Sequence, residues 1–129
     1  MAISPDGRYL AVAHVVSRYD APTKQLDRGW MNTNAVTVID TEEPDKPHPV
    51  LLDDPDAGAA NPWGVSFSED GRTLFVTHAG THELSVIDFP ALLERMKRED
   101  RSNAPVSERL GFLHGLRARL ALPLHGPRA

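Results

Sequence analysis

An eleven-residue segment occurs twice in the chain, and this repeat limits the possible folds more than any other feature. Residues 4–14 (SPDGRYLAVAH) return as residues 68–78 (SEDGRTLFVTH), with 7 of 11 positions identical at a spacing of 64 residues. A second motif, at 35–40, returns at 83–88 with a spacing of 48 residues. The difference between these two spacings predicts an insertion in the first copy of the repeat. The remaining period of 48 is close to that of a four-stranded β-propeller blade.

Local signals within the repeat agree with this interpretation. The Asp70-Gly71 pair is typical of a hairpin turn, because the aspartate can bond the turn backbone and glycine accepts a positive φ. Alternation of side-chain type predicts strands at about 62–67, 73–78 and 83–88 in the second copy. The last strand of the first copy is predicted at His48–Leu52.

The sequence after residue 88 departs from the strand pattern. Pro90 suits the first turn of a helix, and residues 91–98 are good helix formers. Leu110, Leu113 and Leu116 have helical spacing and suggest a second helix. We therefore expect a short helical excursion near the C-terminus.

The predicted fold is mainly β, a partial β-propeller of about two four-stranded antiparallel blades. The first blade covers residues 1–52, starts inside its first strand, and has an insertion at 15–33 between its second and third strands. The second blade covers 53–129, with the helical insertion at 90–116, a last strand at 117–122, and the start of a following blade.

A ring of this kind needs about four to eight blades, and a blade cannot bury both of its faces alone. We therefore expect the chain to be a fragment, a truncated gene product or one part of an assembly. The expected partners are the remaining blades of a parent propeller or other copies of the chain.

Composition excludes several classes of protein. The chain has no cysteine, which excludes disulfides, thiolate catalysis, a Cys-ligated metal and covalent haem attachment within these residues. It has no apolar run of the roughly 18 residues that a membrane helix needs, and its start lacks the features of a signal peptide. Basic residues predominate after residue 88 but are not interleaved with aromatic residues, so we predict a solvated helix face rather than a nucleic-acid partner.

The Ser-x-Asp-Gly-Arg-x-Leu pattern, with its following His and Val-Ile-Asp, resembles the YVTN-type, YncE-like bacterial β-propeller proteins. The segments 27–34, 61–64 and 78–88 look like large periplasmic or surface propeller proteins that also carry c-type cytochrome domains. This resemblance implies an exported parent, periplasmic or extracellular, with an electron-transfer or peroxidase-like role. It also implies haem c, and a cytochrome domain as a partner, in the full-length parent, with no cofactor in this chain.

Blade topology predicts where a binding site would lie. In an antiparallel blade, the loop between the second and third strands and the link to the next blade emerge on the same side of the ring. That side collects the candidate ligand-binding residues, which are His14, Arg18, Arg28, Trp30, Asn32, Asn61, Trp63, His78 and His82. No catalytic residue and no metal ligand is predicted.

The two equivalent histidines, His14 and His78, allow two interpretations. They are ligands or proton donors near the channel, or they are structural residues that cap a strand and bond a neighbouring loop carbonyl. The structural role is the one we favour. A set of His78, His82 and Glu83 as metal ligands is disfavoured, because His82 and Glu83 are adjacent and would point oppositely in a strand.

Other candidates have similar alternatives. Trp30 and Trp63 either stack on a ligand or pack between blades. Arg18 and Arg28 either clamp a carboxylate or pair with nearby aspartates. The acidic run 53–56 is interpreted as a solvated turn rather than a calcium loop, because it lacks the loop glycine and distal glutamate.

Two functions are compatible with these sequence features. The first is a non-catalytic propeller module, a scaffold or docking surface in an exported redox protein. The alternative is a propeller enzyme of the lactonase or hydrolase type, in which a channel metal or histidine activates water. Whether the chain is an enzyme stays open, and we favour the non-catalytic module.

Overall fold

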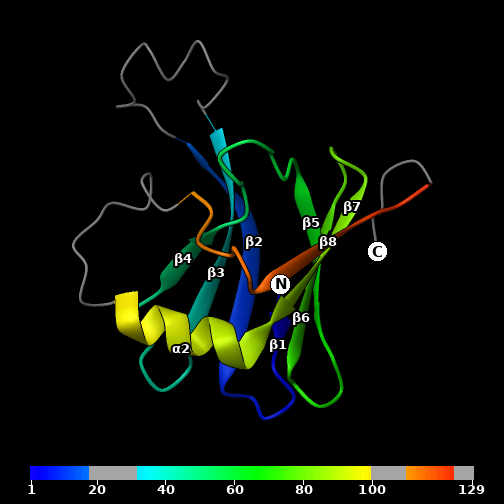
Figure 1. Cartoon of the computed structure of the whole chain (residues 1–129). Coiled ribbons are helices and arrows are strands. Elements are labelled where there is room, and N and C mark those ends of the chain that lie inside the picture. Colours follow the sequence, from blue (N-terminus) through cyan, green and yellow to red (C-terminus); the bar gives the residue numbers. More distant parts are fainter. Residues whose placement is uncertain (18–31, 100–109, 124–129) are drawn as a thin grey trace.

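Two antiparallel sheets of four strands each, with one helix packed across them, make up the part of the chain that the structure describes. A computed structural model describes residues 1–17, 32–99 and 110–123 (Figure 1). The first sheet has the order β1-β2-β3-β4 and the second has the order β5-β6-β7-β8. The predicted mainly β fold is confirmed.

The strands follow each other as simple up-and-down neighbours. In the first sheet they are β1 (Ala2–Ile3), β2 (Tyr9–Ser17), β3 (Asn32–Asp40) and β4 (His48–Leu51). In the second sheet they are β5 (Pro62–Phe67), β6 (Thr73–His78), β7 (Glu83–Asp88) and β8 (Arg117–Ala121). Helix α2 (Phe89–Glu99) follows β7 directly.

The repeated Ser-x-Asp-Gly segment forms the same turn in both sheets. The Ser4 hydroxyl accepts a hydrogen bond from the Tyr9 amide at 2.9 Å and donates to the Asp6 carboxylate at 2.5 Å. The hydroxyl of Ser68 has the same two bonds in the second turn, at 2.9 Å to the Thr73 amide and 2.6 Å to Asp70. The serine bond is the main reason that the pKa of Asp70 lies below its usual value.

The hairpin between β2 and β3 is longer than the repeat predicts. The pairing continues to Ser17 and Asn32, so both ends of the predicted insertion at 15–33 extend the strands. Val15, Val16 and Thr33 are β-branched, which explains why the extended pairing persists there. The rest of the insertion lies outside the described residues.

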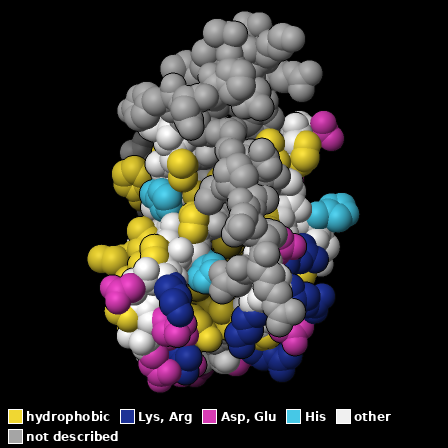
Figure 2. Space-filling view, turned by 90° about the vertical axis from the view of Figure 1, so that its left-hand side faces the viewer, with side chains coloured by type: hydrophobic (Ala, Val, Ile, Leu, Met, Phe, Trp, Pro, Cys, Tyr) yellow, Lys and Arg dark blue, Asp and Glu magenta, His cyan; other side chains and the backbone are white. Residues whose placement is uncertain are grey.

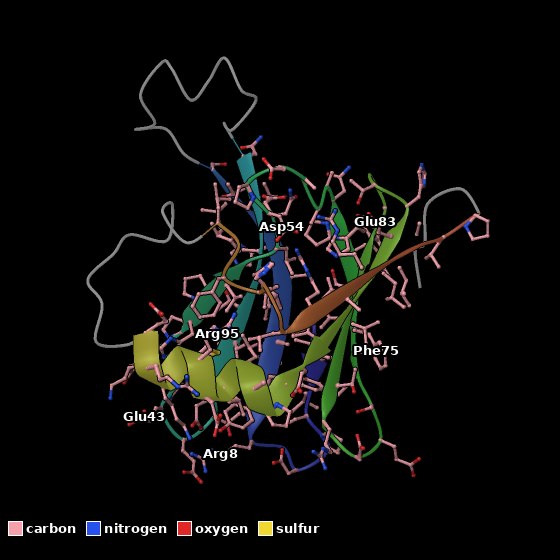
Figure 3. The ribbon with its side chains drawn as sticks, in the orientation of Figure 1. Arg8, Glu43, Asp54, Phe75, Glu83 and Arg95 are labelled. Carbon is pink, nitrogen blue, oxygen red and sulfur yellow. The ribbon has the colours of Figure 1, made fainter. Side chains whose placement is uncertain are left out.

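The predicted second helix is wrong for the residues that can be tested. Residues 110–116 form successive turns in place of a helix. Gly111 and Gly115 adopt positive φ angles of 76° and 78°, which a right-handed helix does not permit. Arg95 of α2 holds this turn segment in place, because its guanidinium donates to the carbonyl oxygens of Phe112 at 2.7 Å and His114 at 2.8 Å (Figure 3).

The core lies between the two sheets and beneath α2. The ring of Phe89 packs edge-on against Tyr9 of the first sheet, with ring centroids 5.4 Å apart, and against Phe67 of the second sheet at 4.9 Å. Leu92 and Met96 of the same helix are buried in this core. Helix α2 therefore fills the space between the sheets and ties them together (Figure 1).

Each sheet contributes a different face to this contact. We call the face of a sheet that carries the repeat histidine its His-bearing face, and the other its opposite face. The opposite face of the first sheet presents Ala11, Val36 and Val38, and these residues share one buried cluster with Leu74, Val76 and Ile87 on the His-bearing face of the second sheet.

We expect Leu92→Ala to destabilise the chain by about 3 kcal/mol, because it empties a fully buried position between the sheets. The matched control is Leu93→Ala, which removes the same atoms from a partly buried neighbour and should cost less. Urea unfolding of both variants measures the difference. Equal losses would show that α2 does not pack as described.

Candidate functional site

The structure does not join the predicted candidates into one site. Arg18, Arg28 and Trp30 lie outside the described residues. Asn32 is exposed at the start of β3, where it pairs with Ser17. Trp63 is 64% exposed on β5.

His78 is the most buried of the candidates, with no exposed surface. Its Nδ1 lies 3.0 Å from the carbonyl oxygen of Ala59, and its Nε2 lies 2.8 Å from the hydroxyl of Ser85. Because a carbonyl only accepts, Nδ1 carries the proton and the Ser85 hydroxyl donates to Nε2. His78 thereby attaches the segment between the two sheets to β6 and β7, the central strands of the second sheet.

His14 occupies the equivalent position in the first sheet but has a different environment. Its Nε2 lies 2.7 Å from the hydroxyl of Thr37, which corresponds to Ser85 in the repeat. It points away from the second sheet, because Ala13 beside it packs against the shared core. The first sheet therefore lies between His14 and His78, and the two histidines do not form a common site.

The backbones of Asn61 and His82 make tight turns with hydrogen-bonded carbonyls. Both have positive φ angles, 53° for Asn61 and 54° for His82. The Asn61 carbonyl accepts a bond from the Ala79 amide at 3.0 Å, and the His82 carbonyl accepts one from the Leu122 amide at 2.8 Å. These bonds hold the tip between β6 and β7 against the linking segment and the end of β8.

Asp53 has a structural role that the sequence pattern did not predict, since it is 2% exposed and not part of a solvated turn. Its carboxylate accepts bonds from the backbone amides of Asn34 at 2.7 Å and Ala59 at 2.6 Å. The side-chain amide of Asn34 donates to the same carboxylate at 3.0 Å. Asp53 therefore fixes the course of the segment that leaves the first sheet.

Two arginines of β8 bind that segment from the second sheet. Arg117, whose side chain is 3% exposed, donates to the Leu52 carbonyl and to Asp54 at 2.5 Å. Arg119 donates to Asp54 at 3.0 Å, to the Gly58 carbonyl at 2.6 Å, and to Glu83. Figure 3 shows Asp54 and Glu83 in this upper region, on the link and on β7.

The electrostatics of this cluster follow from burial and pairing. Burial lowers the pKa of Arg117, although the charge of Asp54 opposes the shift. Burial alone would raise the pKa of Glu83, but the hydrogen bond and the charge of Arg119, together with other neighbouring groups, outweigh burial and hold this pKa below its usual value. The alternating arginines of the last strand were a sequence signal for these ion pairs, but Asp54, the partner that they share, lies more than 60 residues away.

Charged side chains at the other end of the molecule form ion pairs with one another. Figure 2 shows many of them gathered at the lower end. Arg8 there pairs with Asp40 at 2.8 Å, and Lys46 pairs with Glu43 at 3.3 Å. Across residues 1–17, 32–99 and 110–123, no group of three or more histidine, aspartate or glutamate side chains is arranged to hold a metal ion. Helix α2 is too short and polar to cross a membrane.

We expect the stability of the chain to fall as the pH drops below about 6.5, the ordinary pKa of histidine. Burial lowers the pKa of His78 in the folded state, so the unfolded chain binds this proton more readily and acid favours unfolding. Urea unfolding between pH 8 and 5 measures the effect. His78→Gln should remove this component, whereas His14→Gln retains His78 and should keep it. A slope that survives in His78→Gln would contradict the assignment.

We expect Asp53→Asn to cost about 2 kcal/mol of stability, because one of the two oxygens that accept backbone bonds becomes an amide nitrogen, which only donates, so one of these bonds is lost. The matched control is Asp56→Asn on the exposed part of the same loop, which should change the unfolding free energy little. Thermal unfolding of both variants gives the comparison. A small effect at Asp53 would show that its buried bonds are dispensable.

Comparison with known proteins gives related results from sequence and structure. No family model matches the chain. Hydrazine synthase subunit beta from Kuenenia stuttgartiensis is 31% identical over 90 residues, which are 70% of this chain and 23% of that protein. The solved structure of Kuenenia stuttgartiensis hydrazine synthase matches 98% of this chain with a TM-score of 0.78 and 26% identity, over 36% of that chain.

The chain thus spans 23% of the length of the curated relative that it matches. The sequence match and the structural match point to the same enzyme, and together they show common ancestry. The two sheets and the helix are homologous to a part of the beta subunit of hydrazine synthase.

Proposed function

We propose that the two sheets are adjacent blades of a β-propeller and that they act as a non-catalytic module. In this proposal the module is a scaffold or docking surface within a larger redox protein. The support is the way the sheets meet, since each contributes one apolar face to a shared core. The chain covers 36% of the matched hydrazine synthase chain, which is consistent with a part of a larger assembly.

The main support for a structural role is that the polar side chains between the blades already have hydrogen-bond partners. The ring nitrogens of His78, the carboxylate of Asp53 and the guanidinium of Arg117 all bind neighbouring backbone or side-chain groups. Groups satisfied in this way stabilise one geometry of the link and are not poised to activate water.

The relative is named as one subunit of a synthase, which supports a role beside other subunits in the larger protein. We further propose, from the resemblance to cytochrome-associated propellers, that the full-length parent is periplasmic or extracellular and contains haem c, with no cofactor in this chain. Because the chain has no cysteine, a covalently attached haem would be bound by other residues. The module would then position a cytochrome domain without touching the reacting atoms.

The test compares this proposal with the hydrolase alternative. The purified chain is incubated with Zn²⁺, Ca²⁺ or Mn²⁺, desalted, analysed for bound metal, and assayed with lactone and ester substrates. We expect no stoichiometric metal and no hydrolysis above that of buffer, for the wild type and for His78→Gln alike. One bound ion per chain, with hydrolysis lost in a folded His78→Gln variant, would overturn the non-catalytic assignment.

A further inference from the structure

Each of the two sheets has one face that is not covered by the other sheet. Figure 3 shows Phe75 on the side of the second sheet that points away from the first. Val86 pairs with Phe75 across β6 and β7, and Leu120 of β8 is 49% exposed. On the first sheet, Leu10, Val12 and Ile39 lie on the His-bearing face and are partly exposed.

The repeat indicates what kind of surface fits each uncovered face. Phe75, Leu84 and Val86 of the second sheet correspond to Ala11, Val36 and Val38 of the first. The latter three are at most 1% exposed, in a cluster that also contains residues from the His-bearing face of the second sheet and from α2. The opposite face of the second sheet is therefore suited to receive another His-bearing face.

The same correspondence holds at the other end of the chain. Leu10, Val12 and Ile39 correspond to Leu74, Val76 and Ile87, which have no exposed surface. These covered residues belong to the cluster that the second sheet shares with the first. The His-bearing face of the first sheet is therefore suited to pack on another opposite face.

His14 adds a polar group to the uncovered His-bearing face of the first sheet. In the covered interface, the Nδ1 atom of His78 donates to the carbonyl of Ala59, in the segment that enters the second sheet from the first. The equivalent ring of His14 is held by Thr37 through Nε2, and no partner for its Nδ1 is found in the described part of the chain. A blade docked in the same way would offer His14 a carbonyl.

We propose that the opposite face of the second sheet binds the His-bearing face of the first sheet in a second copy of this chain. This inference rests on the proposed function, because it treats each sheet as a propeller blade. The contact joins unlike faces, so it is head-to-tail and each dimer retains one free face of each kind. Association therefore continues beyond the dimer as concentration rises.

Two single variants each disable one face. Phe75→Glu places a carboxylate on the opposite face of the second sheet, and Val12→Glu places one on the His-bearing face of the first. Burying an unpaired charge opposes docking, so each variant alone should be monomeric, with association weakened at least about tenfold. Lys46→Glu in the exposed turn between β3 and β4 is the control for added negative charge and should associate like the wild type.

Mixing the two variants gives the decisive observation. Phe75→Glu keeps an intact His-bearing face and Val12→Glu keeps an intact opposite face, so an equimolar mixture should form a 1:1 dimer that grows no further. Sedimentation velocity with one variant fluorescently labelled measures this. His14→Ala in the Phe75→Glu partner should weaken the dimer, and His14→Gln, whose amide can donate to a carbonyl, should restore part of the affinity.

Circular dichroism and thermal unfolding establish that each variant is folded before it is mixed. Two folded variants that stay monomeric when mixed would overturn the inference, as would a wild-type chain that is monomeric at high concentration. A homodimer of either variant alone would replace the head-to-tail contact with a symmetric one and also overturn it. These outcomes leave the metal and hydrolysis assays untouched, so failure of this inference is distinguishable from failure of the proposed function.

Discussion

The structure depends on one contact, in which the opposite face of the first sheet packs on the His-bearing face of the second. A four-stranded sheet with apolar residues on both faces cannot bury either face by itself. Ala11 and Val38 on one side, and Leu74 and Ile87 on the other, are removed from water in one cluster that the two sheets share with α2. Helix α2 completes the contact where the sheets diverge, since Phe89 packs against both of them.

Polar groups then give this apolar contact a single geometry. Hydrophobic burial is not directional, whereas buried hydrogen bonds are lost unless their partners are placed correctly. Asp53 fixes the start of the link to β3, His78 fixes its end to β6, and Arg117 holds it from β8. The side chains of these three residues are all used in hydrogen bonds that connect the two sheets, and this use favours the proposed scaffold.

The sequence predicted the strands well because the repeat and the period-2 pattern are local signals. The ranges 73–78 and 83–88 have the same bounds in the structure. The bond of His78 to a loop carbonyl agrees with the structural role that the sequence favoured. The ion pairs of the link were not predicted, because their partners are distant in sequence: Arg117 and Asp54 are 63 residues apart. The turn at 110–116 was missed because leucine spacing suggested a helix, whereas the backbone conformation at Gly111 excludes one.

Nuclear Overhauser effects from the Phe89 ring would test the contact between the sheets without any change to the sequence. The ring centroid lies 5.4 Å from that of Tyr9 and 4.9 Å from that of Phe67, on two different sheets. A core shared by the two sheets predicts cross-peaks from Phe89 to both rings, and none of the three depends on side chains at the uncovered faces. Cross-peaks to Phe67 without any to Tyr9 would show that the sheets do not share a core, and would contradict the interpretation as adjacent blades.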